Sequence, residues 1–117
     1  MTSIFSENLQ ERDNKPSKWL KTDELLAAEG LKIKSVDVVE AKNYGAEEGD
    51  SLFEKGVLQE GETIRYSFED SEGNERLYDS KGAGLYIAMK QARPESGVAV
   101  KITRSGKGDK TRYQVNV

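Results

Sequence analysis

The fold is decided by residues 62–104, which read ETIRYSFEDSEGNERLYDSKGAGLYIAMKQARPESGVAVKITR. Residues 62–69 at the start of this stretch alternate, with Ile64, Tyr66 and Phe68 on one side of a strand and polar residues on the other. A polar run containing Gly73 then turns the chain, and a second strand follows it. This opening predicts a β-hairpin whose large apolar side chains pack in the core.

A helix and a second hairpin follow. The apolar residues of 82–92 recur at helical spacing, and Pro94 and Gly97 end the helix. From Val98 the pattern returns to alternation, and a Gly-rich turn leads into a last strand at 111–117. The residues expected to form the apolar face of the helix are Leu85, Ile87, Ala88, Met89 and Ala92.

The stretch before this region predicts a long first strand at 31–42. Leu31 and Ile33 share one face, and the apolar phase then slips by one residue to Val36 and Val38. A slip of this kind indicates a β-bulge. A bulge suits a small barrel, because a long strand must bend to close the sheet.

The complete element order is β-β-β-α-β-β, which is typical of the OB-fold. The sequence therefore predicts an all-β protein, a five-stranded OB-type Greek-key barrel with one internal helix and a short N-terminal helix capped by Thr22. Residues 1–16 are expected to be a flexible N-terminal arm, and residues 17–117 the OB-fold domain. Trp19 is interpreted as an apolar lid over one barrel end, with a base-stacking platform as the alternative.

Composition excludes several classes of function. The chain has 117 residues, enough for one domain, and contains neither cysteine nor histidine. The usual general base, thiol nucleophile and zinc ligands are therefore missing, and we expect no enzyme, no cofactor and no metal site. The sequence has no apolar stretch that could span a bilayer and no signal-peptide pattern, so it predicts a cytoplasmic protein without membrane association.

Charge is distributed unevenly along the chain. The net charge is −3, but residues 1–60 hold 8 basic and 13 acidic side chains, whereas residues 61–117 hold 10 and 8. The negative net charge argues against a protein that coats duplex DNA, because binding along the phosphate backbone needs a basic surface. A local basic stripe on an acidic protein can still hold a short single strand, and the alternative is that these charges only keep a small domain in solution.

Cations and aromatic side chains fall where an OB-type barrel would hold a single strand. Such proteins combine a positive groove with rings that stack on bases. The expected surface comprises the second and third strands and two flanking loops. The predicted nucleic-acid-binding residues are Arg65, Arg76, Tyr78, Tyr44, Phe53, Lys101, Arg104, Lys107, Lys110 and Arg112. For Tyr78 an inward orientation stays open, because Leu77 competes with it for the core. Tyr44 could equally pack in a hairpin, and Phe53 could plug the barrel end.

Several segments together resemble a known family. They are KWLKTDEL at 18–25, GVAVKITR at 97–104, GKG at 106–108 and TRYQV at 111–115. Over residues 17–117 the chain is similar to small phage or prophage OB-fold proteins that bind single-stranded DNA. The resemblance implies non-enzymatic binding of single-stranded nucleic acid, DNA before RNA, in phage or bacterial DNA replication or recombination. It also implies a replication or recombination protein as a partner, and it leaves an oligomer open.

A protein-interaction module is the alternative function. An accessory subunit or inhibitor could use the same barrel face, with the acidic segment 47–50 and Phe53 in contact with its partner. The acidic first half of the chain favours this alternative, and the basic final hairpin favours nucleic acid. Many replicative single-strand binders end in a flexible acidic tail, whereas this sequence ends in a predicted strand. Recruitment of partners through such a tail is therefore not expected.

Overall fold

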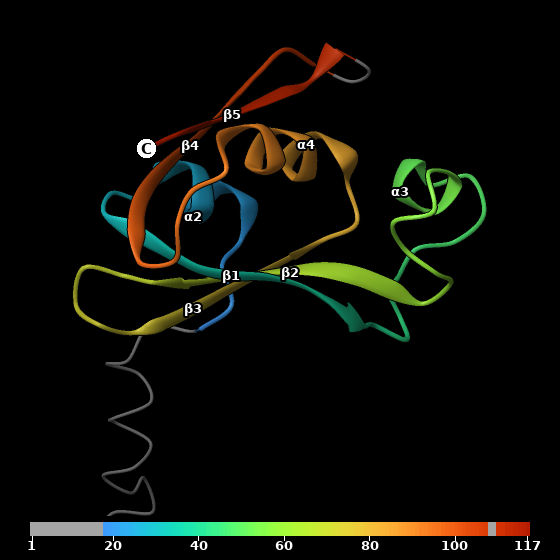
Figure 1. Cartoon of the computed structure of the whole chain (residues 1–117), viewed down its shortest axis with the longest axis horizontal. Coiled ribbons are helices and arrows are strands. Elements are labelled where there is room, and N and C mark those ends of the chain that lie inside the picture. The colour runs from blue at the N-terminus through green and yellow to red at the C-terminus, as the bar shows by residue number, and fades with distance from the viewer. Residues whose placement is uncertain (1–17, 108–109) are drawn as a thin grey trace, which may run out of the picture.

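The computed structural model describes residues 18–107 and 110–117 of the chain. The fold is mostly β, with one five-stranded antiparallel sheet in the order β3-β2-β1-β4-β5 (Figure 1). Its strands are β1 (Leu31–Glu40), β2 (Glu62–Glu69), β3 (Glu75–Ser80), β4 (Val98–Ser105) and β5 (Arg112–Asn116). Its helices are α2 (Thr22–Ala27), α3 (Ser51–Glu54) and α4 (Ala83–Ala92).

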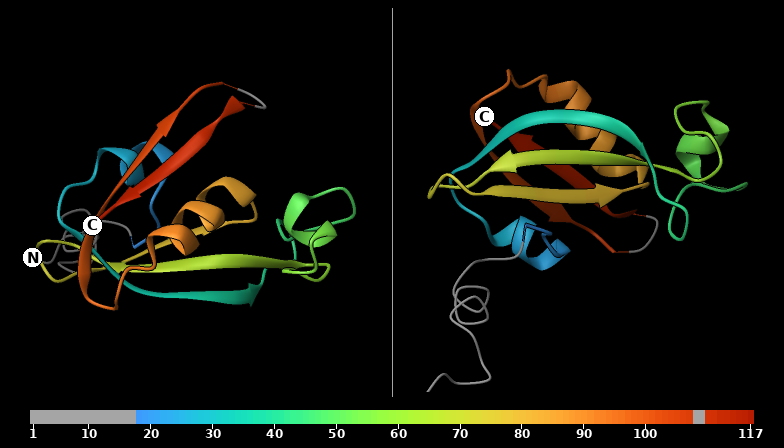
Figure 2. Two further views of the ribbon diagram at one scale, coloured as in Figure 1. Left: turned by 45° about the horizontal axis from the view of Figure 1, so that its top comes forward. Right: turned by 90° about the horizontal axis from the view of Figure 1, so that it is seen from below.

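Helix α4 lies between the two parts of the sheet. Strands β1, β2 and β3 run along one side of it, and the β4–β5 hairpin crosses the other side (Figures 1 and 2). The hairpin packs closely on the helix, because a Cβ atom added at Gly84 would lie 2.9 Å from a ring carbon of Tyr113. The largest fully buried side chains of the core are Tyr66, Phe68, Leu25, Leu52, Ile64 and Ile102.

The sequence pattern predicted the central hairpin and the helix correctly. Strand β2 has the predicted bounds, β3 follows it after a turn, and α4 begins one residue later than expected. Tyr66 and Phe68 are buried on the inner face of β2 as predicted, and Tyr113 is partly buried against the core. The long segment after β1 has structure of its own, since it contains α3.

The predicted bulge in β1 is confirmed. The pairing of β1 with β2 shifts register between Ile33 and Ser35, so one extra residue is accommodated there. Strand β1 pairs with β4 only through the first three residues of β1, Leu31 to Ile33. Beyond that point Val36 and Val38 face the same side as the buried residues of β2, yet they are 39% and 46% exposed. The second half of β1 is therefore an edge strand whose inner face is only partly covered.

The predicted closed barrel is not observed, because β3 and β5 do not pair in the described residues. A segment preceding α2 binds the edge of β3 instead. The backbone N–H of Leu20 donates to the carbonyl of Leu77 at 2.8 Å, and the N–H of Leu77 donates to the carbonyl of Lys18 at 2.5 Å. This parallel bridge takes hydrogen-bonding groups that a closing strand would need.

Three local predictions were wrong. Ile87 is 39% exposed, since a helix of 3.6 residues per turn places it almost opposite Leu85 and Met89. Thr22 is not the N-cap but the first residue of α2, and its hydroxyl is hydrogen-bonded to the Tyr78 hydroxyl at 3.0 Å. Trp19 is not a buried lid, because the adjacent Leu20 is the buried residue.

The expected N-terminal arm, residues 1–16, lies outside the described residues. Among the helices of residues 18–107 and 110–117, none combines the length and apolar character needed to cross a membrane.

Candidate nucleic-acid interface

The outer face of β1, β2 and β3 is acidic. The strand register assigns the residues that point away from α4, and among them acidic side chains outnumber basic ones by four to two. These charged residues are Lys32, Asp37, Arg65, Glu69, Glu75 and Asp79. A phosphate backbone laid across this face would meet net negative charge, although the sequence predicted binding there.

Arg65 is on this outer face, as predicted, but its charge is already paired. Its Nε donates to Oδ1 of Asp79 at 2.9 Å, and its Nη2 donates to Oδ2 of Asp79 at 3.0 Å. The Asp79 side chain is only 7% exposed, which keeps water from competing for this bidentate pair. The hydrogen bonds from Arg65 to Asp79 raise the pKa of the guanidinium further, so Arg65 stays charged and bound to its partner.

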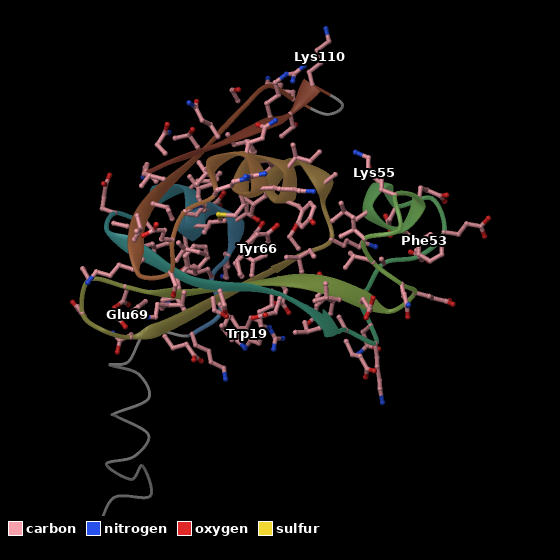
Figure 3. The ribbon with its side chains drawn as sticks, in the orientation of Figure 1. Trp19, Phe53, Lys55, Tyr66, Glu69 and Lys110 are labelled. Carbon is pink, nitrogen blue, oxygen red and sulfur yellow. The ribbon has the colours of Figure 1, made fainter. Side chains whose placement is uncertain are left out.

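Two aromatic residues border the same ion pair. The Tyr44 hydroxyl donates to Oδ2 of Asp79 at 3.0 Å, and this hydrogen bond raises the pKa of the exposed phenol. The guanidinium carbon of Arg65 lies 4.9 Å from the ring centroid of Trp19, a cation–π distance. Trp19 lies on the side of the sheet opposite Tyr66 (Figure 3). Tyr44 and Trp19 thus form one cluster with Arg65 and Asp79.

Arg76 and Tyr78 do not point outward, although the predicted interface requires it, and for Tyr78 the inward orientation is the alternative that the sequence left open. They pair with Phe68 and Tyr66 of β2 and share the inner face with them. The Arg76 side chain is 14% exposed and lies 3.5 Å from a carboxylate oxygen of Asp70. The Tyr78 ring packs against Tyr66 with the ring centroids 6.3 Å apart. Leu77 takes the outer face and is buried there by the bridging segment, which explains the wrong assignment.

Phe53 and Lys101 also have structural roles. Phe53 on α3 is partly buried against the core, so it is not the exposed anchor expected in either predicted function. The Lys101 ammonium donates to the carbonyls of Leu26 and Ala28 at 3.0 Å each. These carbonyls lie at the C-terminal end of α2, where a cation interacts favourably with the helix dipole.

The four remaining predicted cations gather on the β4–β5 hairpin. They are Arg104, Lys107, Lys110 and Arg112, and all four are exposed. Among the described residues no acidic group forms an ion pair with any of them, which distinguishes them from Arg65 and Arg76. The only acidic residue of 97–117 in the sequence is Asp109, which lies outside the described residues.

The geometry of the turn brings the two lysines together. The backbone N–H of Lys110 donates to the carbonyl of Lys107 at 3.0 Å. Gly106 has φ +82°, and a Cβ atom there would lie 2.1 Å from the carbonyl oxygen of Lys110, so only glycine fits. The hairpin extends away from the rest of the fold, and Lys110 is at its far end (Figures 2 and 3).

A second basic region was missed by the sequence reasoning. Lys34, Lys90 and Arg93 line a groove of about 370 Å³ between β1 and α4. Lys90 and Arg93 also line an adjoining hollow beside α3, together with Lys55. Lys34 and Lys55 are far from Lys90 and Arg93 in the sequence, so only the packing of α4 beside β1 and α3 brings these cations together.

The described residues contain no cluster of three or more acidic side chains that could hold a metal ion. Comparisons of the chain with protein-family models, with curated proteins and with solved structures found no match.

Proposed function

We propose that this protein binds single-stranded nucleic acid, DNA in preference to RNA, without enzymatic activity. The observation that carries the proposal is the set of exposed cations on the β4–β5 hairpin that form no ion pair among the described residues, namely Arg104, Lys107, Lys110 and Arg112. A cation that has no carboxylate partner can contact a phosphate directly and release a condensed counterion. A cation that already binds a carboxylate must give up that carboxylate first. The sequence resemblance to phage proteins supports a role in replication or recombination.

We further propose that the open sheet is an OB-type barrel that lacks only the pairing between β3 and β5. Strands β3 and β5 are the two ends of the observed order, so their pairing would close the sheet. Helix α4 between β3 and β4 occupies the position expected for the internal helix of such a barrel. OB-folds are themselves partly open barrels, and a loop between their last two strands frames the ligand. The basic hairpin is that loop in this chain.

The proposed interface differs from the one that the sequence predicted. The outer face of β2 and β3 is acidic, and its Arg65 is held by Asp79. We therefore place the phosphate contacts on the hairpin and assign none to Arg76, Tyr78, Phe53 or Lys101. The exposed ring of Tyr44 stays a candidate for base stacking at one end of the outer face.

Salt dependence of binding tests the proposal. Fluorescence anisotropy of a labelled single strand of about 20 nucleotides should give measurable affinity at low salt, where electrostatic attraction is least screened. The double variant Lys107→Gln/Lys110→Gln should bind more weakly. Its plot of log affinity against log salt should be flatter by about 1.4, since each phosphate contact on a single strand contributes about 0.7.

A matched control is Lys32→Gln/Lys42→Gln, which removes the same charge from two exposed lysines outside the hairpin. Its salt slope should equal that of the wild type. Equal flattening in the control would mean that only net charge matters and that the hairpin is not the site. Absence of measurable affinity for the wild-type protein at low salt would refute single-strand binding altogether.

A further inference from the structure

The groove between β1 and α4 combines an apolar floor with a basic rim. Ile33, Val36 and Met89 supply apolar lining, and the volume is about 370 Å³. The charged residues that line it are Lys34, Lys90 and Arg93. None of the described residues that line the groove is acidic, in a protein whose net charge is −3.

A free strand edge runs along the same groove. On the side of β1 that faces β4, the last contacts are a hydrogen bond from Gly97 N–H to the Ile33 carbonyl at 2.6 Å and one from the Ser96 hydroxyl to the Lys34 carbonyl at 2.9 Å. From Ser35 onward, β1 has no strand partner on that side among the described residues. Figure 2 (right) shows β1 at the border of the sheet, next to α4. Such an edge offers unpaired backbone groups to another strand.

Arg93 is held at the groove by an unusual backbone. It is the C-cap of α4, with φ 46° and ψ 52°, and it is the only non-glycine residue with positive φ among the described residues. Glycine is the usual residue in this left-handed conformation, and Pro94 follows directly. A cation at a helix C-terminus interacts favourably with the helix dipole, which explains in part why this position holds an arginine and not a glycine. The strain is also consistent with a functional requirement for the guanidinium at this position.

We propose that this groove binds an extended acidic peptide of a partner protein, which adds to the free edge of β1 as a further strand. Alternate side chains of an added strand point to one face, so every second residue of the peptide would face the groove, with apolar residues beside Val36 and Val38. Acidic residues on that same face would pair with Lys90 and Arg93 on the rim.

A peptide fits these observations better than a nucleic acid does. The edge of β1 presents backbone N–H and C=O groups in the spacing of a strand, which matches another polypeptide and not a phosphate chain. The lining is mainly apolar, and among the described residues that line the groove the only aromatic one is Tyr86. A single strand would instead need a series of stacking rings along a positive groove.

The test uses the full chain and a labelled probe peptide of about eight residues, long enough to span the free part of β1. Every second residue of the probe is alternately valine and aspartate, and the residues between them are serine, so that one face of the strand carries both apolar and acidic side chains. We expect saturable binding in fluorescence anisotropy, and chemical-shift changes in the backbone amides of residues 35–40. The double variant Lys90→Glu/Arg93→Glu should weaken binding about tenfold or more, because it reverses two charges on the rim. Lys32→Glu/Lys42→Glu, with the same change in net charge elsewhere, should leave the affinity unchanged.

Backbone methylation of the probe separates strand addition from simple charge attraction. A strand in the groove directs alternate N–H groups toward β1. Methylating every second peptide nitrogen should therefore abolish binding in one frame and preserve it in the other. Equal binding in both frames, or no binding of the unmodified probe, would overturn the proposal.

Competition with nucleic acid distinguishes this proposal from the proposed function. The Lys107→Gln/Lys110→Gln variant should lose single-strand affinity and keep the peptide. Two results together would show that the groove belongs to the nucleic-acid site. In the first, Lys90→Glu/Arg93→Glu weakens binding of the single strand as much as binding of the peptide, and in the second the single strand displaces the peptide. The peptide proposal would then be wrong.

Discussion

The Tyr66 hydroxyl is a buried polar group without a hydrogen-bond partner among the described residues. The residue is fully buried on the inner face of β2, and burial is the main reason why the pKa of its phenol is raised. A hydroxyl taken out of water without a partner costs about 1–3 kcal/mol of stability. The Tyr66→Phe variant keeps the ring and its packing and removes only that cost.

We therefore expect Tyr66→Phe to stabilise the protein. Taking the lower end of that range, the free energy of unfolding should rise by about 1 kcal/mol. For a domain of this size the melting temperature should rise by about 4 °C. Urea unfolding measures the change, and a shifted midpoint with an unchanged slope would show that the effect is on stability.

Tyr78→Phe is the matched control. Its ring packs 6.3 Å from that of Tyr66, but its hydroxyl is hydrogen-bonded to the Thr22 hydroxyl at 3.0 Å. Removing this hydroxyl leaves Thr22 without its partner, so the control should lower stability by about 1 kcal/mol. If Tyr66→Phe destabilises the protein as much as Tyr78→Phe does, the Tyr66 hydroxyl has a partner after all and the reasoning is refuted.

Two further predictions concern the core and the acid stability of the fold. Leu85→Asp should prevent folding, because it buries an unpaired charge. Ile87→Asp should remain folded, as measured by circular dichroism, because Ile87 is exposed. Equal loss of folded structure in both variants would contradict the assigned helix face. The backbone N–H of Asn74 is the main cause of the lowered pKa of Asp70. A carboxyl whose pKa is lowered in the folded state stabilises the protein. This contribution is complete at a pH above the carboxyl's ordinary pKa of about 4, and it is lost as the pH falls through the carboxyl's pKa in the folded state. Asp70→Asn should therefore flatten the decline of stability below about pH 4 in urea titrations, and an unchanged decline would exclude this contribution.

Local pattern was sufficient to predict most of the secondary structure. Strict alternation predicted β2 with correct bounds, and the phase slip after Ile33 predicted the bulge, since both depend on neighbouring residues alone. The exposure of Ile87 could also have been predicted, because its angle on the helix differs from that of Leu85.

The candidate site was much less predictable, because it depends on partners distant in the sequence. Arg65 and Asp79 pair across two strands, and nothing in the order of the residues indicates that this cation is occupied. Strand β3 carries both Leu77 and Tyr78, and the bridging segment at 18–20 decides which of them can be buried on the outer face. The failure of the sheet to close has the same origin, since that segment binds the edge of β3.

That bridging segment also has a consequence for the order of folding. The two hydroxyls that fasten α2 to β3, those of Thr22 and Tyr78, are 56 residues apart in sequence. Closing so long a loop costs chain entropy before any contact compensates for it, whereas β2 and β3 are joined by a tight turn and can pair early. The segment at 18–20 leaves the ribosome before all the strands, yet its binding site exists only after β3 has formed. Residues synthesised before every strand of the sheet thus reach their native position only after β3 has formed, and mutations at Leu20 should accelerate unfolding while leaving the rate of folding nearly unchanged.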